Sequence, residues 1–178
     1  MAIFDAYIDL LYSYRKTVNL TGVTAREDLE KIVADSACDL PEHARVLDLG
    51  SGGGIPGIPL KLLHPNIEIS FCDKARKKMN IVSSLCFQLH ITPKHVCIGD
   101  AREICKDHPG EFTHIVSRGM GETAFVADCA FPFLTAGGML FLWKPSGYDI
   151  HTDGVLNGYA FIQKINKEYC SIVTLQKQ

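Results

Sequence analysis

The stretch RVLDLGSGGGIPGIPL, residues 45–60, joins a short apolar run to five glycines and two prolines. A run of this kind that ends in a glycine-rich turn is typical of a buried strand followed by a ligand-binding loop and a helix. Glycine adopts positive φ without strain and lets a ligand approach the main chain with no Cβ in the way. Five glycines within residues 50–57 are more than a plain strand-to-helix turn needs. We therefore interpret the stretch as a nucleotide-binding loop.

Strands and helices are predicted to alternate on both sides of this loop. Helices are expected over residues 2–14, 24–40, 57–64, 77–91 and 123–134, and strands over 45–50, 67–73, 94–100, 114–119 and 137–145, with two antiparallel strands within 160–177. Thr24, with Glu27 three residues later, is the expected capping box of the second helix. Pro56 and Pro59 fit the third helix only near its first turn. The alternation predicts an α/β fold with a doubly wound, Rossmann-like, mostly parallel sheet and an antiparallel C-terminal strand.

Length, charge and composition limit the classes of protein. The 178 residues suggest a single domain, 1–178, with a short helical N-terminal segment of about residues 1–40 that covers the site. A formal net charge of -2 excludes a globally basic nucleic-acid binder but leaves room for a local basic patch. The seven cysteines form no CxxC pair, so we expect reduced thiols, no metal site and a cytoplasmic protein. We also expect a monomer. No signal peptide or membrane-spanning run is expected.

The glycine spacing fits two cofactors. Gly52, Gly54 and Gly57 satisfy the G-x-G-x-x-G pattern of dinucleotide-binding enzymes, and Gly50, Gly52 and Gly54 equally satisfy the G-x-G-x-G pattern of S-adenosylmethionine (SAM) enzymes. Asp48 favours SAM, because a carboxylate repels a pyrophosphate and attracts a sulfonium or an ammonium. Asp48 is also a suitable cap of the glycine turn, and the two roles are compatible.

Two further carboxylates follow the next predicted strands. Asp73 ends the second strand, where it suits the ribose hydroxyls of either cofactor or the N-cap of the next helix. Asp100 ends the third strand, where it either accepts a hydrogen bond from an adenine amine or caps the following helix. The residues alone leave these alternatives open.

The chain resembles the bacterial small-subunit ribosomal RNA guanine-N7 methyltransferases of the RsmG or GidB family. The resemblance runs from about Asn19 to about Lys144 and rests on NLTGV at 19–23, ADS at 34–36, DLGSGGGIPGIPL at 48–60, FCDKARKK at 71–78, IVSRG at 115–119 and LWKP at 142–145. It implies a class I SAM methyltransferase that acts on ribosomal RNA, free or in the small subunit, and forms 7-methylguanosine. The SAM contacts that it implies are Gly50, Ile55, Asp73, Ala101, Arg102 and Arg118. It also implies a substrate-facing pocket that contains Asn19, Lys77 and Lys144.

The sequence departs from the pattern of this family at several positions. Ile32 stands where histidine is common, Asp100-Ala101-Arg102 replaces an Arg-Ala-Glu order, and Pro145 replaces a glycine. The helical N-terminal arm of the family is usually longer than the 18 residues that precede Asn19. We expect these departures to reduce or redirect activity on the substrate more than they affect cofactor binding.

A basic run, KARKK at 74–78, borders the expected mouth of the site. Lys74, Arg76, Lys77 and Lys78 are typical of a solvated helix face, but in this place they favour contact with RNA phosphates. The histidines are scattered without ligand spacing, and no catalytic triad or strong base is visible. Methyl transfer to guanine N7, a free lone pair, needs none. The alternatives are a SAM enzyme that methylates a small molecule or a protein, and a dinucleotide-binding oxidoreductase or sensor.

Overall fold

A computed structural model describes residues 2–14, 20, 22, 23, 25–150 and 156–178. The helices are α1 (Asp5–Tyr14), α2 (Arg26–Ala34), α3 (Gly57–Leu63), α4 (Arg76–Gln88), α5 (Ala101–Ile104) and α6 (Thr123–Ala130). The strands are β1 (Arg45–Leu49), β2 (Glu68–Asp73), β3 (Val96–Ile98), β4 (Phe112–Arg118), β5 (Leu134–Pro145), β6 (Tyr159–Asn166) and β7 (Cys170–Lys177). Three short 3-10 turns are η1 (Ala2–Phe4), η2 (Cys105–Asp107) and η3 (Phe131–Phe133).

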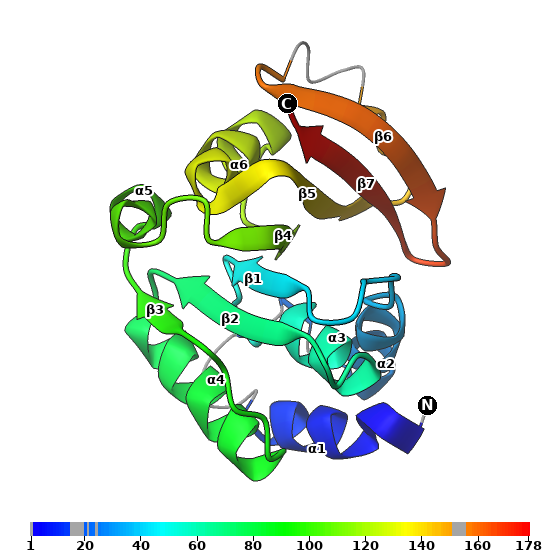
Figure 1. The fold of residues 1–178 in the computed structure, drawn as a ribbon. Coiled ribbons are helices and arrows are strands. Elements are labelled where there is room, and N and C mark those ends of the chain that lie inside the picture. The colour runs from blue at the N-terminus through cyan, green and yellow to red at the C-terminus, as the bar shows by residue number, and fades with distance from the viewer. Residues whose placement is uncertain (1, 15–19, 21, 24, 151–155) are drawn as a thin grey trace.

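The seven strands form one sheet in the order β3-β2-β1-β4-β5-β7-β6 (Figure 1). β1 to β5 run parallel, and β7 pairs antiparallel with both β5 and β6. This confirms the predicted mostly parallel sheet with an antiparallel C-terminal end. The strand order reverses at β1, which has β2 on one side and β4 on the other. The carboxyl ends of β1 and β4 therefore form the switch point at which ligands bind in open α/β sheets.

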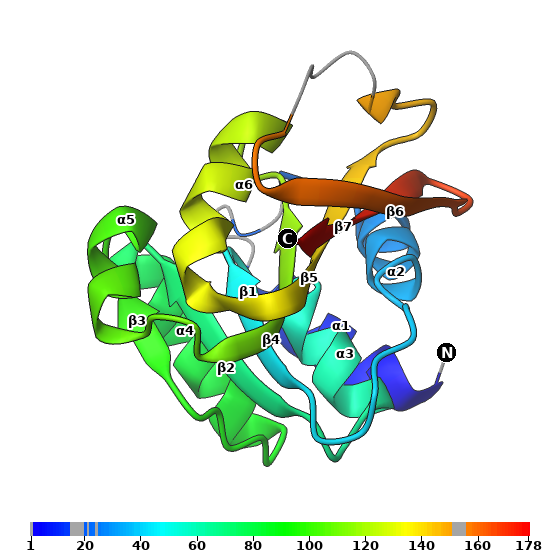
Figure 2. The ribbon, with the colours of Figure 1, turned by 45° about the horizontal axis from the view of Figure 1, so that its top comes forward.

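Neighbouring strand residues face opposite sides of the sheet, and both sides are covered. Val46 and Val116 pack with helices α1 to α4, whereas the next residue of β1, Leu47, packs with α5 and α6. Figure 2 shows α1, α3 and α4 on one face of the sheet and α5 and α6 on the other. Burial on both faces explains why the strands read as continuous apolar runs rather than as alternating ones.

Some predicted boundaries differ from the structure. The second helix ends at Ala34, not at residue 40, and its first residue follows Ala25; the predicted cap Thr24 lies outside the described residues. The helix predicted over 77–91 ends at Gln88, shortly before His90, whose φ of 55° lies in the left-handed region. The helix predicted over 123–134 ends at Ala130, where Pro132 belongs to η3. The four-residue helix α5 was anticipated only as the helix that Asp100 would cap, and its bounds were not predicted.

The N-terminal helix α1 is hydrogen-bonded to the glycine loop and to α4. Tyr7 of α1 is fully buried, and its hydroxyl donates a hydrogen bond of 2.8 Å to the carbonyl of Gly53. Tyr14, at the end of α1, shares a hydrogen bond of 3.0 Å with Ser84 of α4. The first helix thus fixes both the loop and the helix that borders it.

The seven cysteines carry free thiols, as expected, and five of them are buried. Among the described residues, no helix combines the length and apolarity that a membrane crossing requires.

Candidate functional site

A cavity of about 600 Å³ lies at the carboxyl ends of β1 to β4. Its walls come from the glycine loop, from the starts of the segments after β2, β3 and β4, and from the N-terminal segment. They are Leu20, Gly22, Ile32, Leu49, Gly50, Ser51, Gly52, Gly53, Ile55, Cys72, Asp73, Lys74, Ala75, Lys78, Gly99, Asp100, Ala101, Arg102, Arg118, Gly119, Met120 and Phe125. The volume is within the range of small-molecule and cofactor sites.

The glycine loop has no room for side chains at its turning points. Gly50 has a φ of 75°, and a Cβ added to it would lie 2.9 Å from the side chain of Met120, which lines the cavity. Gly54 has a φ of 84°, and a Cβ there would lie 2.6 Å from Ile58. Ser51 closes the turn, because its hydroxyl donates to the carbonyl of Asp48 at 2.7 Å and accepts from the amide of Cys72 at 3.1 Å. Gly54 gives the loop its turn beside Ile58 and does not line the cavity.

Asp73, at the end of β2, joins two elements at the centre of the cavity. Its Oδ2 accepts a hydrogen bond of 2.9 Å from the amide of Gly52, and its Oδ1 accepts one of 2.8 Å from the amide of Ala75. The predicted carboxylate in the cavity wall is present. The predicted N-cap is wrong, because the N-cap of α4 is Ala75, and Asp73 instead closes the turn that precedes the helix. Each carboxylate oxygen accepts more than one hydrogen bond, so both retain capacity for a ligand.

Asp48 lies behind the glycine loop and is not part of the cavity wall. Its side chain is fully buried, and its Oδ2 accepts a hydrogen bond of 3.0 Å from the amide of Gly57 at the start of α3. Burial raises its pKa to about 7, although the Gly57 amide acts to lower it. Of its two expected roles, the structure shows the cap of the glycine turn; an attraction to a cationic cofactor would act without contact.

Asp100 and Arg102 pair with each other at one end of the cavity. Asp100 is the N-cap of α5 and accepts from the Arg102 amide at 3.0 Å, while the Arg102 guanidinium donates to both of its oxygens at 3.0 and 2.7 Å. These hydrogen bonds hold the pKa of the Asp100 carboxyl well below its usual value. The Arg102 guanidinium carbon lies 6.0 Å from the centre of the aromatic ring of Phe125 in α6. This end offers an apolar ring surface and a capping carboxylate.

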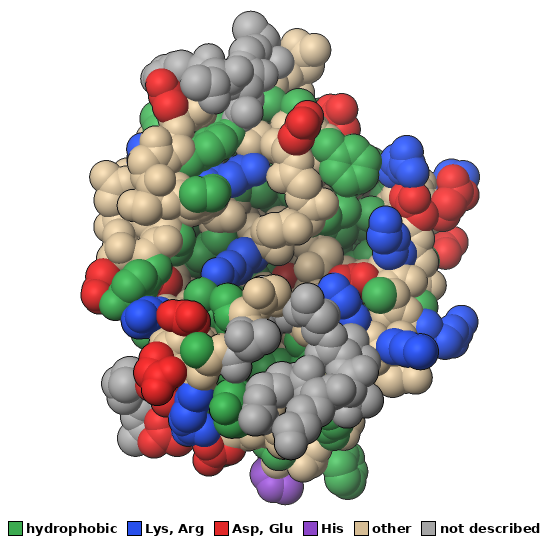
Figure 3. Space-filling model, turned by 180° about the vertical axis from the view of Figure 1, so that it is seen from behind, with side chains coloured by type: hydrophobic (Ala, Val, Ile, Leu, Met, Phe, Trp, Pro, Cys, Tyr) green, Lys and Arg blue, Asp and Glu red, His purple; other side chains and the backbone are tan. Residues whose placement is uncertain are grey.

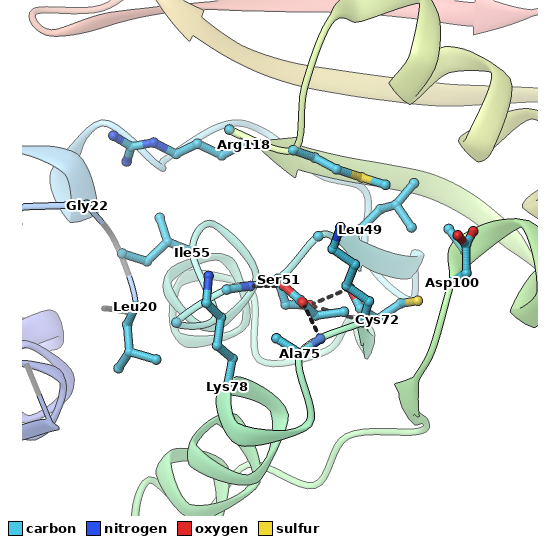
Figure 4. A pocket seen from close by; sticks show the side chains of 18 of the residues that line it. Leu20, Gly22, Leu49, Ser51, Ile55, Cys72, Ala75, Lys78, Asp100 and Arg118 are labelled. Carbon is cyan, nitrogen blue, oxygen red and sulfur yellow. Dashed lines mark hydrogen bonds between the residues drawn. The ribbon is translucent and has the colours of Figure 1, made fainter. Parts of the chain in front are cut away.

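The other end of the cavity is apolar and basic (Figure 4). Ile55 and Leu20 lie there beside Lys78, which rises from α4 toward the centre of the cavity. Arg118, at the end of β4, donates a hydrogen bond of 3.3 Å to the carbonyl of Ile32, and burial lowers its pKa. Ile32, where the family commonly has histidine, is buried in the wall beside it.

The basic run divides into two faces. Lys74 and Lys78, four residues apart, line the cavity, whereas Arg76 and Lys77 are exposed outside it. Sequence reasoning assigned Lys77 to the substrate pocket and missed Lys78 in that role; Lys74 precedes α4, and Lys78 lies in its first turn. The face of the molecule opposite to the view of Figure 1 is hollowed, and Lys and Arg side chains lie in and beside the hollow (Figure 3).

Two other substrate-positioning candidates lie differently. Lys144, near the end of β5, does not line the cavity; its Nζ donates to the carbonyl of Gly121 at 3.4 Å and lies 5.2 Å from the ring centre of Tyr148. Asn19 lies outside the described residues. Trp143, the residue before Lys144 in β5, is a core residue, and its Nε1 donates a hydrogen bond of 2.9 Å to the carbonyl of Asp35.

Sequence reasoning missed two features for which the residues gave little local signal. Met120 and Phe125 line the cavity although they lie beyond β4, outside the motifs that carried the prediction. His95, His108 and Glu111 come together at the opposite edge of the sheet, although their spacing resembles no metal motif.

Comparison with known proteins gives the family. Residues 1–174 match the profile of the GidB family, described as rRNA small subunit methyltransferase G. Proteins named ribosomal RNA small subunit methyltransferase G are 33% identical in Moorella thermoacetica, with 90% of this chain and 68% of that protein covered, and 27% identical in Streptococcus pyogenes serotype M4, with 89% and 71% covered.

Solved structures share the fold at low identity. The PH0226 protein of Pyrococcus horikoshii has a TM-score of 0.67 at 12% identity, covering 93% of this chain and 98% of that one. A SAM dependent methyltransferase of Aquifex aeolicus has a TM-score of 0.61 at 15% identity, covering 85% and 90%. With a class I methyltransferase fold, a glycine loop closed by Asp73 and a family match along nearly its whole length, this chain belongs to the rRNA small subunit methyltransferase G (GidB) family.

Proposed function

We propose that this protein transfers the methyl group of SAM to N7 of a guanine in small-subunit ribosomal RNA. The observation that carries the proposal is the position of Asp73, which closes the glycine loop through the amide of Gly52 and faces a cavity of about 600 Å³. We infer that residues 1–178 act as a single, monomeric methyltransferase domain in the cytoplasm, with the segment of about residues 1–40 as a cover of the site. Leu20, Gly22 and Ile32 of that segment line the cavity, which supports this role.

The cavity fits SAM in size and in the placement of its polar groups. Asp73 would hold the ribose hydroxyls with the hydrogen-bonding capacity that the Gly52 and Ala75 amides leave unused. Ala101, Phe125 and the Asp100–Arg102 pair would enclose the adenine, and Ile55 and Arg118 would border the methionine part. Gly50, Gly52 and Gly53 line the cavity without side chains, so the backbone of the loop would itself border the ligand. SAM, when bound, supplies a methyl group attached to a positively charged sulfur.

The described cavity wall holds no general base with a pKa near neutrality. No histidine is among its residues. Burial raises the pKa of the Cys72 thiol to about 12, so it remains protonated. Asp100 is paired with Arg102, and both oxygens of Asp73 accept backbone hydrogen bonds. Transfer to an exocyclic amine or a ribose hydroxyl requires proton removal, whereas guanine N7 attacks with a free lone pair. The wall therefore favours N7 as the acceptor.

The charge of the wall favours a nucleic-acid substrate over a small molecule or a protein. Lys74, Lys78 and Arg118 add positive charge to the cavity, and Arg76 and Lys77 continue it onto the exposed side of α4. Cations in this arrangement bind phosphates, and Lys78 is placed to contact either a phosphate or the guanine O6. The protein's part in catalysis is then to hold the acceptor in line with the methyl group.

Methylation of purified small subunits and of free ribosomal RNA with labelled SAM tests the proposal. The product should carry a fixed positive charge on the imidazole ring of guanine, which makes the strand sensitive to borohydride and alkali. The double variant Lys77→Glu/Lys78→Glu should weaken RNA binding. It should also make the plot of log affinity against log salt concentration less steep, by about the contribution of two phosphate contacts. Lys106→Glu, at an exposed lysine on η2, is the control for a lysine-to-glutamate exchange outside the basic run and should leave RNA binding unchanged. Methylated RNA that resists scission would move the acceptor away from N7.

A further inference from the structure

A cluster of histidine and carboxylate side chains lies at the edge of the sheet opposite to the cavity. His95 directly precedes β3, and Glu111 directly precedes β4. Parallel strands begin at one edge and end at the other, so these residues lie at the starts of the strands while the cavity lies at their ends. His108, the residue after η2, completes the cluster.

The carboxylate of Glu111 lies between the two imidazoles and contacts both. His95 Nε2 lies 2.8 Å from Glu111 Oε1, and His108 Nδ1 lies 2.6 Å from Glu111 Oε2. The candidate ligand atoms all lie within 4.8 Å of one another. All three side chains are partly exposed, between 17% and 31%, so an ion reaches them from solvent.

The backbone beneath the cluster is fixed. The carbonyl of His95 accepts from the amide of Phe71 in β2 at 3.0 Å, and the carbonyl of Glu111 accepts from the Arg45 Nε at 2.7 Å. Ligands held by rigid elements and by hydrogen bonds behind them are what a metal site requires.

A second layer of contacts orients one of the histidines. The far ring nitrogen of His108, Nε2, lies 3.7 Å from Cys97 Sγ, which turns Nδ1 toward the cluster. Histidines that bind metals commonly engage their other ring nitrogen in this manner. Lys94 is the positive charge that would compete with a metal ion for Glu111, because its Nζ lies 3.6 Å from Glu111 Oε1. Lys94 is exposed and also pairs with Glu68 at 3.0 Å, so it keeps a partner when an ion binds Glu111.

We propose that His95, His108 and Glu111 form a binding site for a divalent transition-metal ion, best suited to Zn²⁺, in which water takes the remaining position. Two imidazoles and one carboxylate are a ligand set of zinc sites. Tetrahedral zinc with bonds of about 2.0–2.1 Å separates its ligand atoms by about 3.3 Å. The two contacts of 2.6 and 2.8 Å, which run to different oxygens of Glu111, must open by less than about 1 Å, and the widest separation, within 4.8 Å, must close by up to about 1.5 Å. This proposal differs from the expectation from the sequence that the protein has no metal site.

The ion would fasten both ends of one segment of the chain. Residues 95–111 leave the cluster along β3, pass Gly99, Ala101 and Arg102 in the cavity wall, and return through η2 to the cluster. The site would therefore stabilise the segment that encloses one end of the cavity, without contact with the cavity itself.

Metal titration of the full chain tests the proposal. After treatment with a chelator, the protein should bind one equivalent of Zn²⁺ in competition with a chromophoric chelator, and bound Zn²⁺ should raise its Tm. His95→Gln and His108→Gln should each weaken binding by at least about 100-fold, and Cys97→Ala by about 10-fold. His90→Asn, at an exposed histidine outside the cluster, is the control and should change nothing.

Cobalt substitution of the unaltered protein separates this site from binding by cysteines. Co²⁺ held by imidazoles and a carboxylate should show visible d–d bands without a thiolate charge-transfer band in the near ultraviolet. A thiolate band, a stoichiometry other than one, or unchanged affinity in both His95→Gln and His108→Gln would overturn the proposal. None of these readouts depends on methyl transfer, so this inference stands or falls separately from the proposed function.

Discussion

Replacing Asp48 by asparagine should change how the stability of the protein depends on pH. Asp48 is fully buried, accepts one hydrogen bond from the Gly57 amide, and has no partner for Oδ1 among the described residues. Burial raises its pKa from 3.8 to about 7. A buried carboxyl of this kind is a neutral acid in the folded protein at a pH where it is already ionised in the unfolded chain.

The sign and size of the effect follow from the two pKa values of Asp48. Below about pH 4 both states hold the proton, and between about pH 4 and 7 only the folded state holds it, so stability falls as the pH rises through this window. A shift of about three units corresponds to about 4 kcal/mol, of which roughly 2.5 kcal/mol falls between about pH 5 and 8. Asp48→Asn keeps an acceptor for the Gly57 amide and does not ionise, so it lacks this loss.

Urea unfolding of both proteins at several values from about pH 5 to about pH 8 measures the difference. The free energy of unfolding of Asp48→Asn, relative to that of the unaltered protein, should rise by roughly 2.5 kcal/mol across this range. Asp39→Asn, at an exposed aspartate, is the control and should give a constant difference. A relative stability of Asp48→Asn that stays constant from pH 5 to pH 8, within about 0.5 kcal/mol, would refute the buried neutral carboxyl.

Three further variants probe the cofactor and the reaction. Asp73→Ala should weaken SAM binding in calorimetry by roughly 1–3 kcal/mol, because it removes the ribose contact and the support of the Gly52 amide; unchanged affinity would place the ribose elsewhere. Gly50→Ala should abolish measurable SAM binding, because a Cβ would lie 2.9 Å from Met120 at a φ of 75°, and wild-type affinity would contradict the geometry of the loop. With saturating SAM, the single-turnover rate should be nearly flat from roughly pH 6.5 to 8.5, and a tenfold rise per unit would reveal a general base. Lys144→Ala should lower that rate by about 100-fold if Lys144 orients the guanine, and a rate within twofold would limit it to its contacts with Gly121 and Tyr148.

The sheet and the cofactor loop were predictable because their signals are local. A buried apolar run before glycines predicted β1 and its turn, and the aspartate at the end of the next run predicted Asp73. The position of Lys78 in the cavity, rather than Lys77, depends on the rotation of α4, which the sequence does not specify until the first residue of the helix is known. The sequence also placed Asp48 at the cofactor, whereas its neighbour Leu49 lines the cavity and Asp48 does not. Consecutive strand residues face opposite sides, and the sequence does not specify which of the two faces the ligand.

The rest of the site depends on contacts between distant segments. α5 has four residues, too few to show helical periodicity. Phe125 and Met120 reach the cavity because the chain after β4 folds back over it, and no local pattern signals this return. His95 and Glu111 are joined by a hydrogen bond although they are sixteen residues apart in sequence and although β2 and β1 lie between their strands in the sheet.

The bond between the Tyr7 hydroxyl and the Gly53 carbonyl has a consequence for synthesis of the protein from its N-terminus. α1 leaves the ribosome before the glycine loop and before α4, both of which it contacts in the finished fold. A helix of ten residues is too short to be stable in water by itself. Its apolar face must therefore wait, exposed, until the chain has been translated at least through Ser84 of α4. We expect nascent chains that stop before this residue to be sensitive to proteases at their N-terminus, and longer chains to become protected there.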